Sequence, residues 1–203
     1  MVIRENMNDE IKSAREIALE KAEQIGEATD EERLEWKYKP EGEKLAAKYL
    51  REDSNLVVEL RQYEEKAKKY VVKGAMDVLT RNLSLPKNDV EKKNNRRVMD
   101  GVKLLKTDKV AVENVYSKIR YLFNHYTEEG EKQRQQAYQS LKADMGNKIQ
   151  QAMQQQMGPL MGMKIDVEKQ PQFQQEWRKM QIQLDAAYIT HLNEYKQELL
   201  AIE

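Results

Sequence analysis

The stretch that decides the fold is the last segment of the chain, residues 171–202, which reads PQFQQEWRKMQIQLDAAYITHLNEYKQELLAI. It opens with proline, which is favoured in the first turn of a helix, and it contains no glycine. Its seam positions follow steps of four and three residues, the spacing of a helix face that packs on another helix; they are Phe173, Trp177, Met180, Leu184, Ala187 and His191. The seam then shifts to Tyr195, Leu199 and Ile202, a local stutter. The stretch predicts a long helix with a narrow apolar seam.

The preceding segment predicts a partner for this helix. Residues 128–157 carry apolar side chains at helical spacing, and Gly158-Pro159 then interrupts them; the seam is Ala137, Leu141, Met145, Ile149, Ala152 and Met153. Sixteen of the 18 glutamines lie beyond residue 126. We therefore expect a helical body over residues 1–126, followed by a long antiparallel, coiled-coil-like hairpin over residues 127–203 with its turn near residues 158–170.

The body is expected to contain several short and medium helices. Thr29 and Glu32 form the pattern of a capping box, and Pro40 is expected to end that helix and to open the next one. The other predicted helices are residues 9–28, residues 56–81 capped by Asp53-Ser54, residues 89–105 with Val90, Val98 and Val102 inward, and a helix capped by Thr107 or Asp108 that ends near Tyr126. The clearest buried stripe is Val112, Val115, Ile119, Leu122 and Tyr126.

Composition sets the class of protein. The 203 residues include only eight glycines and four prolines, too few for the many turns of an all-β fold, so the chain is predicted to be all-α. The absence of cysteine excludes disulfides, thiolate metal sites and cysteine nucleophiles. No apolar run has the length of a signal peptide or of a membrane span, so we expect a cytoplasmic protein with no membrane partner.

The balanced charge, 35 basic against 35 acidic residues, conceals separate blocks. Residues 1–60 carry 10 basic and 16 acidic groups, whereas residues 61–126 carry 16 basic and eight acidic groups. The densest basic positions are Lys87, Lys92, Lys93, Arg96, Arg97, Lys103, Lys106 and Lys109. The favoured interpretation is that they lie against the acidic block of the same chain; the alternative is that they bind nucleic acid or another polyanion. No aromatic residue interleaves them to stack on bases, and the helix after Asp108 offers few base-reading side chains.

The sequence provides no support for a catalytic, cofactor-binding or metal site. Its two histidines, His125 and His191, lack the spacing of zinc or di-iron helices. His191 is expected to be a core histidine of the seam, and His125 to interact with carbonyls at a helix end. Glycine-rich phosphate loops and Gly-x-Ser-x-Gly are absent.

The segment most open to a functional interpretation is residues 150–163, which contain four methionines between Met153 and Met163. Methionine is common on surfaces that accept varied apolar partners, so a partner-binding patch is predicted at Met157, Leu160, Met161 and Met163. The alternative is that these side chains pack into the body or into a second subunit. The functional hypothesis is a non-enzymatic protein–protein interaction module (an adaptor, assembly factor or structural subunit) with a protein partner or as a homo-oligomer. The second hypothesis is polyanion binding through residues 87–109.

Overall fold

The protein is all-α. The computed structural model describes residues 29–52, 54–157 and 166–202, with only the backbone for residues 156 and 157, and every regular element in these ranges is a helix. The elements are α2 (Asp30–Arg51), α3 (Leu56–Leu60), α4 (Glu65–Arg81), α5 (Asp89–Leu105), α6 (Lys109–Met157), the 3-10 helix η1 (Val167–Lys169) and α7 (Pro171–Ala201). The prediction of an all-α fold is confirmed. The predicted helix over residues 9–28 and the Gly158-Pro159 break lie outside the described residues.

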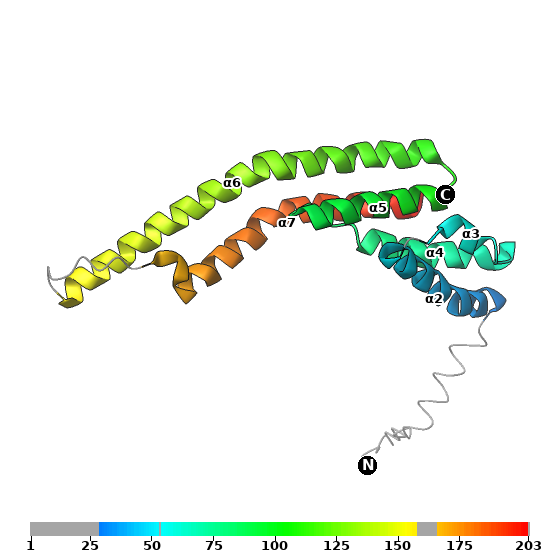
Figure 1. Cartoon of the computed structure of the whole chain (residues 1–203), viewed down its shortest axis with the longest axis horizontal. Coiled ribbons are helices and arrows are strands. Elements are labelled where there is room, and N and C mark those ends of the chain that lie inside the picture. The colour runs from blue at the N-terminus through cyan, green and yellow to red at the C-terminus, as the bar shows by residue number, and fades with distance from the viewer. Residues whose placement is uncertain (1–28, 53, 158–165, 203) are drawn as a thin grey trace, which may run out of the picture.

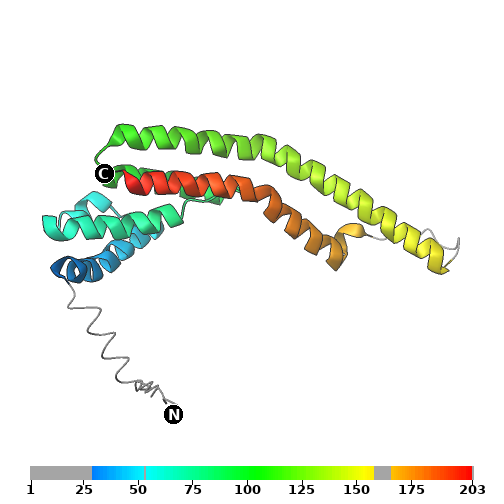
Figure 2. The ribbon, with the colours of Figure 1, turned by 180° about the vertical axis from the view of Figure 1, so that it is seen from behind.

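Two long helices organise the molecule. Helices α6 and α7 lie side by side and run in opposite directions, and the shorter helices gather at one end of the pair (Figures 1 and 2). Helix α6 has 49 residues, which corresponds to roughly 73 Å at a rise of about 1.5 Å per residue. Among the described helices, none combines the length and the apolar character needed to cross a membrane.

Helix α2 begins where the sequence predicts but continues further. The Thr29–Glu32 capping box is present, with Glu32 N–H donating to Thr29 Oγ1 at 3.2 Å and Thr29 N–H donating to Glu32 Oε2 at 2.8 Å. The predicted break at Pro40 is wrong, because Pro40 lies inside one continuous helix. The carbonyl that loses its helical partner belongs to Trp36, a residue with 66% exposure, so water can satisfy it.

Helices α2 and α4 approach closely enough for their backbones to touch. A Cβ atom at Gly42 would lie 1.9 Å from the carbonyl oxygen of Val71, and one at Gly74 would lie 2.0 Å from that of Lys39. Ion pairs Lys39–Asp77 at 2.8 Å and Glu35–Lys73 at 2.6 Å flank this contact. This packing supports the continuous helix through Pro40, and it places part of the acidic block against part of the basic block.

The single helix predicted over residues 56–81 is wrong: the structure divides it into α3 and α4. Asn55, rather than Ser54, caps α3, with its Oδ1 accepting from Val57 N–H at 3.0 Å; Asp53 lies outside the described residues. Tyr63 N–H donates to the Leu60 carbonyl at 3.3 Å in the turn that follows. Because this turn redirects the chain, the buried residues of α3 and those of α4 reach the same core.

On the buried faces of α5 and α6, the buried residues match most of the apolar stripes that the sequence predicts. Asp108 caps α6 by accepting from Ala111 N–H at 2.9 Å, and the predicted stripe of α6 is buried throughout. The expected inward position of Val90 is wrong, since its side chain is 78% exposed. The predicted helix end near Tyr126 is also wrong, because α6 continues to Met157. Gly130 does not break it; this glycine accommodates Tyr188 of α7, whose hydroxyl would lie 3.1 Å from a Cβ there.

The seam of α7 shifts earlier than the sequence pattern suggests. The described inward positions are Phe173, Trp177, Met180, Leu184, Asp185, Tyr188, Leu192, Tyr195, Leu199 and Ile202, whereas Ala187 and His191 are exposed. The stutter therefore falls between Leu184 and Leu192, about one heptad before the predicted place. His191 is not a core histidine; it contacts Glu194 Oε2 at 3.0 Å on the surface.

Candidate functional site

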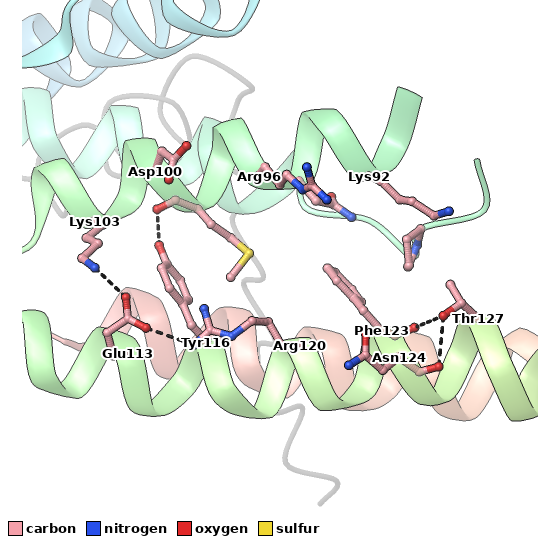
Figure 3. Close-up of a pocket in the computed structure, with 13 residues that line it drawn as sticks. Lys92, Arg96, Asp100, Lys103, Glu113, Tyr116, Arg120, Phe123, Asn124 and Thr127 are labelled. Carbon is pink, nitrogen blue, oxygen red and sulfur yellow. Dashed lines mark hydrogen bonds and ion pairs between the residues drawn. The ribbon is translucent and has the colours of Figure 1, made fainter. Parts of the chain in front are cut away.

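A groove between α5 and α6 has both polar and apolar walls. It has a volume of about 410 Å³. It is lined by residues from the α4–α5 loop, α5 and α6, among them Pro86, Lys92, Arg96, Met99, Asp100, Lys103, Glu113, Tyr116, Arg120, Phe123, Asn124 and Thr127 (Figure 3). Three of these, Lys92, Arg96 and Lys103, belong to the basic positions that the sequence singled out.

One end of the groove is closed by charge pairing. Glu113 accepts from Lys103 Nζ at 2.6 Å and from Arg120 Nη2 at 3.0 Å, and these bonds hold the pKa of Glu113 below its ordinary value. Tyr116 donates its hydroxyl to the Met99 carbonyl. Burial, with a smaller contribution from the charge of Glu113, raises the pKa of Tyr116 strongly. This end connects α5 to α6 and has its charges already satisfied; we call it the paired end.

The other end of the groove, which we call the open end, is formed by Pro86, Lys92, Arg96, Phe123, Asn124 and Thr127. Lys92 Nζ lies 3.0 Å from Asp89 Oδ1, but the Asp89 side chain is 95% exposed, so this is a surface pair of small net energy. Among the described residues, no carboxylate or hydrogen-bond partner contacts the guanidinium of Arg96. The open end therefore presents cations beside an aromatic ring (Figure 3).

The loop wall of the groove is fixed by a buried asparagine. Asn95, which is 3% exposed, donates from Nδ2 to the Ser84 carbonyl at 2.6 Å and accepts from Ser84 N–H at 3.0 Å. Lys87 N–H donates to Glu91 Oε2 at 2.7 Å. These bonds tie the loop that carries Pro86 to α5, so the open end is a built surface.

The eight predicted polyanion-binding residues do not form one surface. Arg97 donates to the carbonyls of Tyr49 and Glu52, and Lys106, which is 9% exposed, donates to the carbonyls of Leu200 and Ile202 at the end of α7. The remaining partners are Asp185 for Lys87, Asp89 for Lys92, Glu113 for Lys103 and the carbonyls of residues 103 and 106 for Lys109. Burial lowers the pKa of Lys106. In the described structure, only Lys93 and Arg96 have side chains without such a partner.

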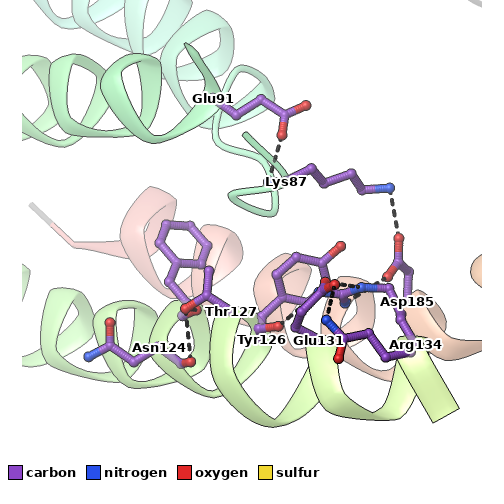
Figure 4. A network of polar contacts seen from close by, with 10 residues as sticks. Lys87, Glu91, Asn124, Tyr126, Thr127, Glu131, Arg134 and Asp185 are labelled. Atoms are coloured by element: carbon purple, nitrogen blue, oxygen red, sulfur yellow. Dashed lines mark hydrogen bonds and ion pairs between the residues drawn. The ribbon is translucent and has the colours of Figure 1, made fainter. Parts of the chain in front are cut away.

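A buried polar network lies beyond the open end (Figure 4). Asp185 of α7 is 4% exposed; its Oδ2 lies 2.7 Å from Lys87 Nζ, and its Oδ1 lies 3.9 Å from Arg134 Nη1. Arg134 also donates to the Tyr126 carbonyl at 3.2 Å and stacks on the Tyr126 ring at 4.3 Å. Burial, with the charge of Asp185, raises the pKa of Tyr126 strongly. The network joins the α4–α5 loop, α6 and α7.

Sequence reasoning missed this network and the α6 side of the groove. Asp185 lies seven residues before Leu192 and 14 before Leu199, so its inward position follows from the heptad that those leucines define. Glu113 and Arg120 are likewise seven residues apart, which places them on one face of α6. The predicted role of His125 at a helix end is wrong, because it lies within α6 and its Nδ1 is 2.9 Å from Tyr188 Oη.

The far part of the α6–α7 pair, which we call the arm, consists of α6 residues 131–157 and α7 residues 171–184. Among the described side chains of the arm, only Phe173 is buried. Its helices meet mainly at an aromatic cluster, with Tyr138 at 5.3 Å from Phe173 and 5.0 Å from Trp177 between ring centroids, edge to face. Of the predicted partner-binding residues, Met157 ends α6, and Leu160, Met161 and Met163 lie outside the described residues.

The described residues contain no candidate metal site. No group of three or more His, Asp or Glu side chains in them could hold a metal ion.

Comparison with known proteins places the chain in a family. No curated protein and no solved structure matches it. A family model described as a family of unknown function, DUF6657, matches residues 57–201, a range that contains the groove, the polar network and the arm but excludes α2. The chain therefore belongs to the family of unknown function DUF6657.

Proposed function

We propose that this protein is a non-enzymatic helical interaction module, an adaptor, assembly factor or structural subunit, that uses its arm to self-associate or to bind a protein partner. The observation that carries the proposal is the single buried side chain, Phe173, among the described side chains of the arm. A two-helix segment that buries so little of its own surface gains stability when another surface covers it.

The seam of α6 supports this proposal. Leu141, Met145, Ile149 and Met153 are half-buried, so the facing helix covers only part of each side chain. Helix propensity and one aromatic cluster keep the arm formed, while its apolar edge stays accessible to a further helix. The methionines add a surface that adapts to different partners.

The outer face of α7 offers a second apolar line. Ile182 is 64% exposed and Ile189 is 44% exposed. They lie seven residues apart, so both point to the same side, and exposed Ala186 lies between them. This line continues from the arm toward the body, and it is the geometry that a partner helix would use in a coiled-coil contact.

Light scattering of the full chain over a range of concentrations tests the proposal. We expect a mass above the 23.9 kDa of one chain, and we expect I182K/I189K to lower it. The matched control is Q183K/T190K, which adds the same charges at exposed positions one residue further along. The proposal would be overturned by a strict monomer whose arm resists proteolysis as well as its body does. The apolar surface of such an arm would already be covered within one chain.

Polyanion binding through residues 87–109 is the second candidate. Exposed Lys93 and Arg96, without partners among the described residues, favour it. It ranks second because the other six basic residues already contact groups of the same chain. Retention on a polyanion column that falls steeply with salt is the expected result if it is correct.

A further inference from the structure

We propose that the open end of the groove between α5 and α6 is a binding site for a small organic anion, a phosphate or carboxylate attached to a flat apolar group. The site lies on the body and uses none of the residues assigned to the arm. It therefore stands independently of the interaction role proposed above.

Two cationic side chains of α5 at the open end, Arg96 and Lys92, can interact with an anion in the groove. Arg96 has no partner among the described residues, and its planar guanidinium matches two oxygens of a phosphate or carboxylate. Lys92 is engaged only with the fully solvated Asp89, a contact that an anion can replace at little cost. Asn124 of α6 is also among the residues that line the groove.

The distribution of charged side chains along the groove favours an anion as the ligand of the open end. The acidic residues that line it are Asp100 and Glu113, and both lie toward the paired end (Figure 3). Glu113 is held there by Lys103 and Arg120. The open end consequently has two cations and no lining carboxylate.

The apolar walls of the open end favour a ligand in which the anion is attached to an organic group. Phe123 projects from α6 and Pro86 from the loop, so an apolar surface adjoins the cations. The buried Asn95–Ser84 bonds fix the loop wall, which reduces the ordering cost of binding. The whole groove, including its paired end, has a volume of about 410 Å³, within the size range of small-molecule sites. A free inorganic anion would leave this apolar wall uncovered, so we expect it to bind more weakly.

The probe that tests the proposal is phenyl phosphate, added to the full chain and followed by NMR chemical shifts. We expect saturable binding at concentrations below ~10 mM, with shifts confined to residues around the groove. Inorganic phosphate is expected to bind more weakly, and phenol is expected to produce no saturable shift. R96Q should weaken phenyl phosphate roughly tenfold, since a charge-assisted contact is lost. F123L should reduce the affinity for phenyl phosphate to that for inorganic phosphate.

The matched control compares neighbouring lysines. K92Q and K93Q remove the same charge from α5, but only Lys92 lines the groove. K92Q should weaken binding several-fold, and K93Q should leave it unchanged. Circular dichroism of each variant confirms that the helices are intact.

Three results would overturn the proposal. One is the absence of saturable binding of phenyl phosphate, and another is an equal loss of affinity in K92Q and K93Q, which would indicate diffuse surface charge. The third is tight binding of a single-stranded oligonucleotide that K93Q weakens as much as R96Q does, which would assign these residues to an extended polyanion surface.

Discussion

The two parts of α6 differ in how the chain supports them. From Val112 to Tyr126 the helix places a full stripe in the core, with Val112 and Ile119 at 0% exposure. Among the described side chains of residues 131–155, none is buried. The first part of this uninterrupted helix is therefore stabilised by packing in the core. The second part is stabilised by helix propensity and by contact with a single neighbouring helix.

This difference teaches that helix length and helix stability have separate causes here. Residues with strong helix propensity, such as glutamine, lysine and alanine, allow α6 to continue far beyond the body. The buried stripe of α6, however, ends near Gly130, which packs against Tyr188 of α7. We expect the body to open only with global unfolding and the arm to open locally at a lower free energy.

The largest expected effect comes from truncating one isoleucine in each part. Ile119→Ala should lower the free energy of unfolding by about 2–5 kcal/mol, because it leaves a cavity in the core. Ile149→Ala, the same change in the half-buried seam of the arm, should lower it by less than about 1 kcal/mol. Urea denaturation followed by circular dichroism measures both values. Equal losses would show that the arm is packed as firmly as the body.

The buried network at the junction of the two parts gives the next effect. Lys87→Met should destabilise the chain by about 1–3 kcal/mol, because the buried carboxylate of Asp185 then loses its nearest cation and keeps only Arg134, 3.9 Å away. Asp185→Leu together with Lys87→Met should recover most of the loss, since no unpaired charge remains. Denaturation of the two single variants and the double variant forms a double-mutant cycle. Additive losses would contradict the assigned pair.

The fold class and several helix starts could be predicted because periodicity and caps are local signals. Thr29, Asp108 and the stripe ending at Tyr126 are examples in which the local signal agrees with the packing. Pro40 is the opposite case: its local preference ends a helix, but the contact of Gly42 and Gly74 across α2 and α4 overrides that preference. Gly42 meets Val71 and Gly74 meets Lys39, pairs that lie 29 and 35 positions apart in sequence, so no window around Pro40 contains either contact.

Only the α5 side of the candidate site could be predicted from the sequence. The cations of α5 were visible as a charge cluster, yet the sequence does not reveal that Arg97 and Lys106 are turned to backbone carbonyls. Phe123 and Asn124 belong to another helix and join Arg96 only through tertiary packing. Residues on one helix can be placed on a common face from spacing alone; residues on two helices require the crossing geometry.

A smaller effect is expected from the aromatic cluster that holds the arm together. Tyr138→Leu removes two edge-to-face contacts and should weaken the arm by about 1 kcal/mol. Hydrogen exchange should become faster at amides of α7 residues 171–184 and stay unchanged in α5. Phe123→Leu is a control aromatic replacement on the same helix, at the groove. If both variants accelerate exchange equally throughout the chain, the arm does not open as a separate unit.

The smallest expected effect is pH dependence, and it compares Glu113 of the body with Glu168 of η1, which contacts the arm through Lys142. Contacts with Lys103 and Arg120 hold the pKa of Glu113 below its ordinary value, and contacts with Lys142 and Tyr138 do the same for Glu168. A carboxyl group whose pKa is lowered by folding stabilises the native state above its ordinary value, near 4.5, and loses that contribution as the pH falls through the lowered pKa. Both side chains contact solvent, so each contribution is small.

Variants of the two carboxylates distinguish an effect of acid on global unfolding from an effect on local opening of the arm. Glu113→Gln should remove part of the loss of stability that acid causes in global denaturation, because Glu113 joins α5 to α6 in the body. Glu168→Gln should leave global denaturation nearly unchanged and should remove the acid-induced acceleration of hydrogen exchange in the arm, where Lys142 holds η1 against α6 at 2.6 Å. Acid effects of Glu168 on global unfolding would mean that body and arm unfold together. The two parts of α6 would then differ in burial without differing in stability.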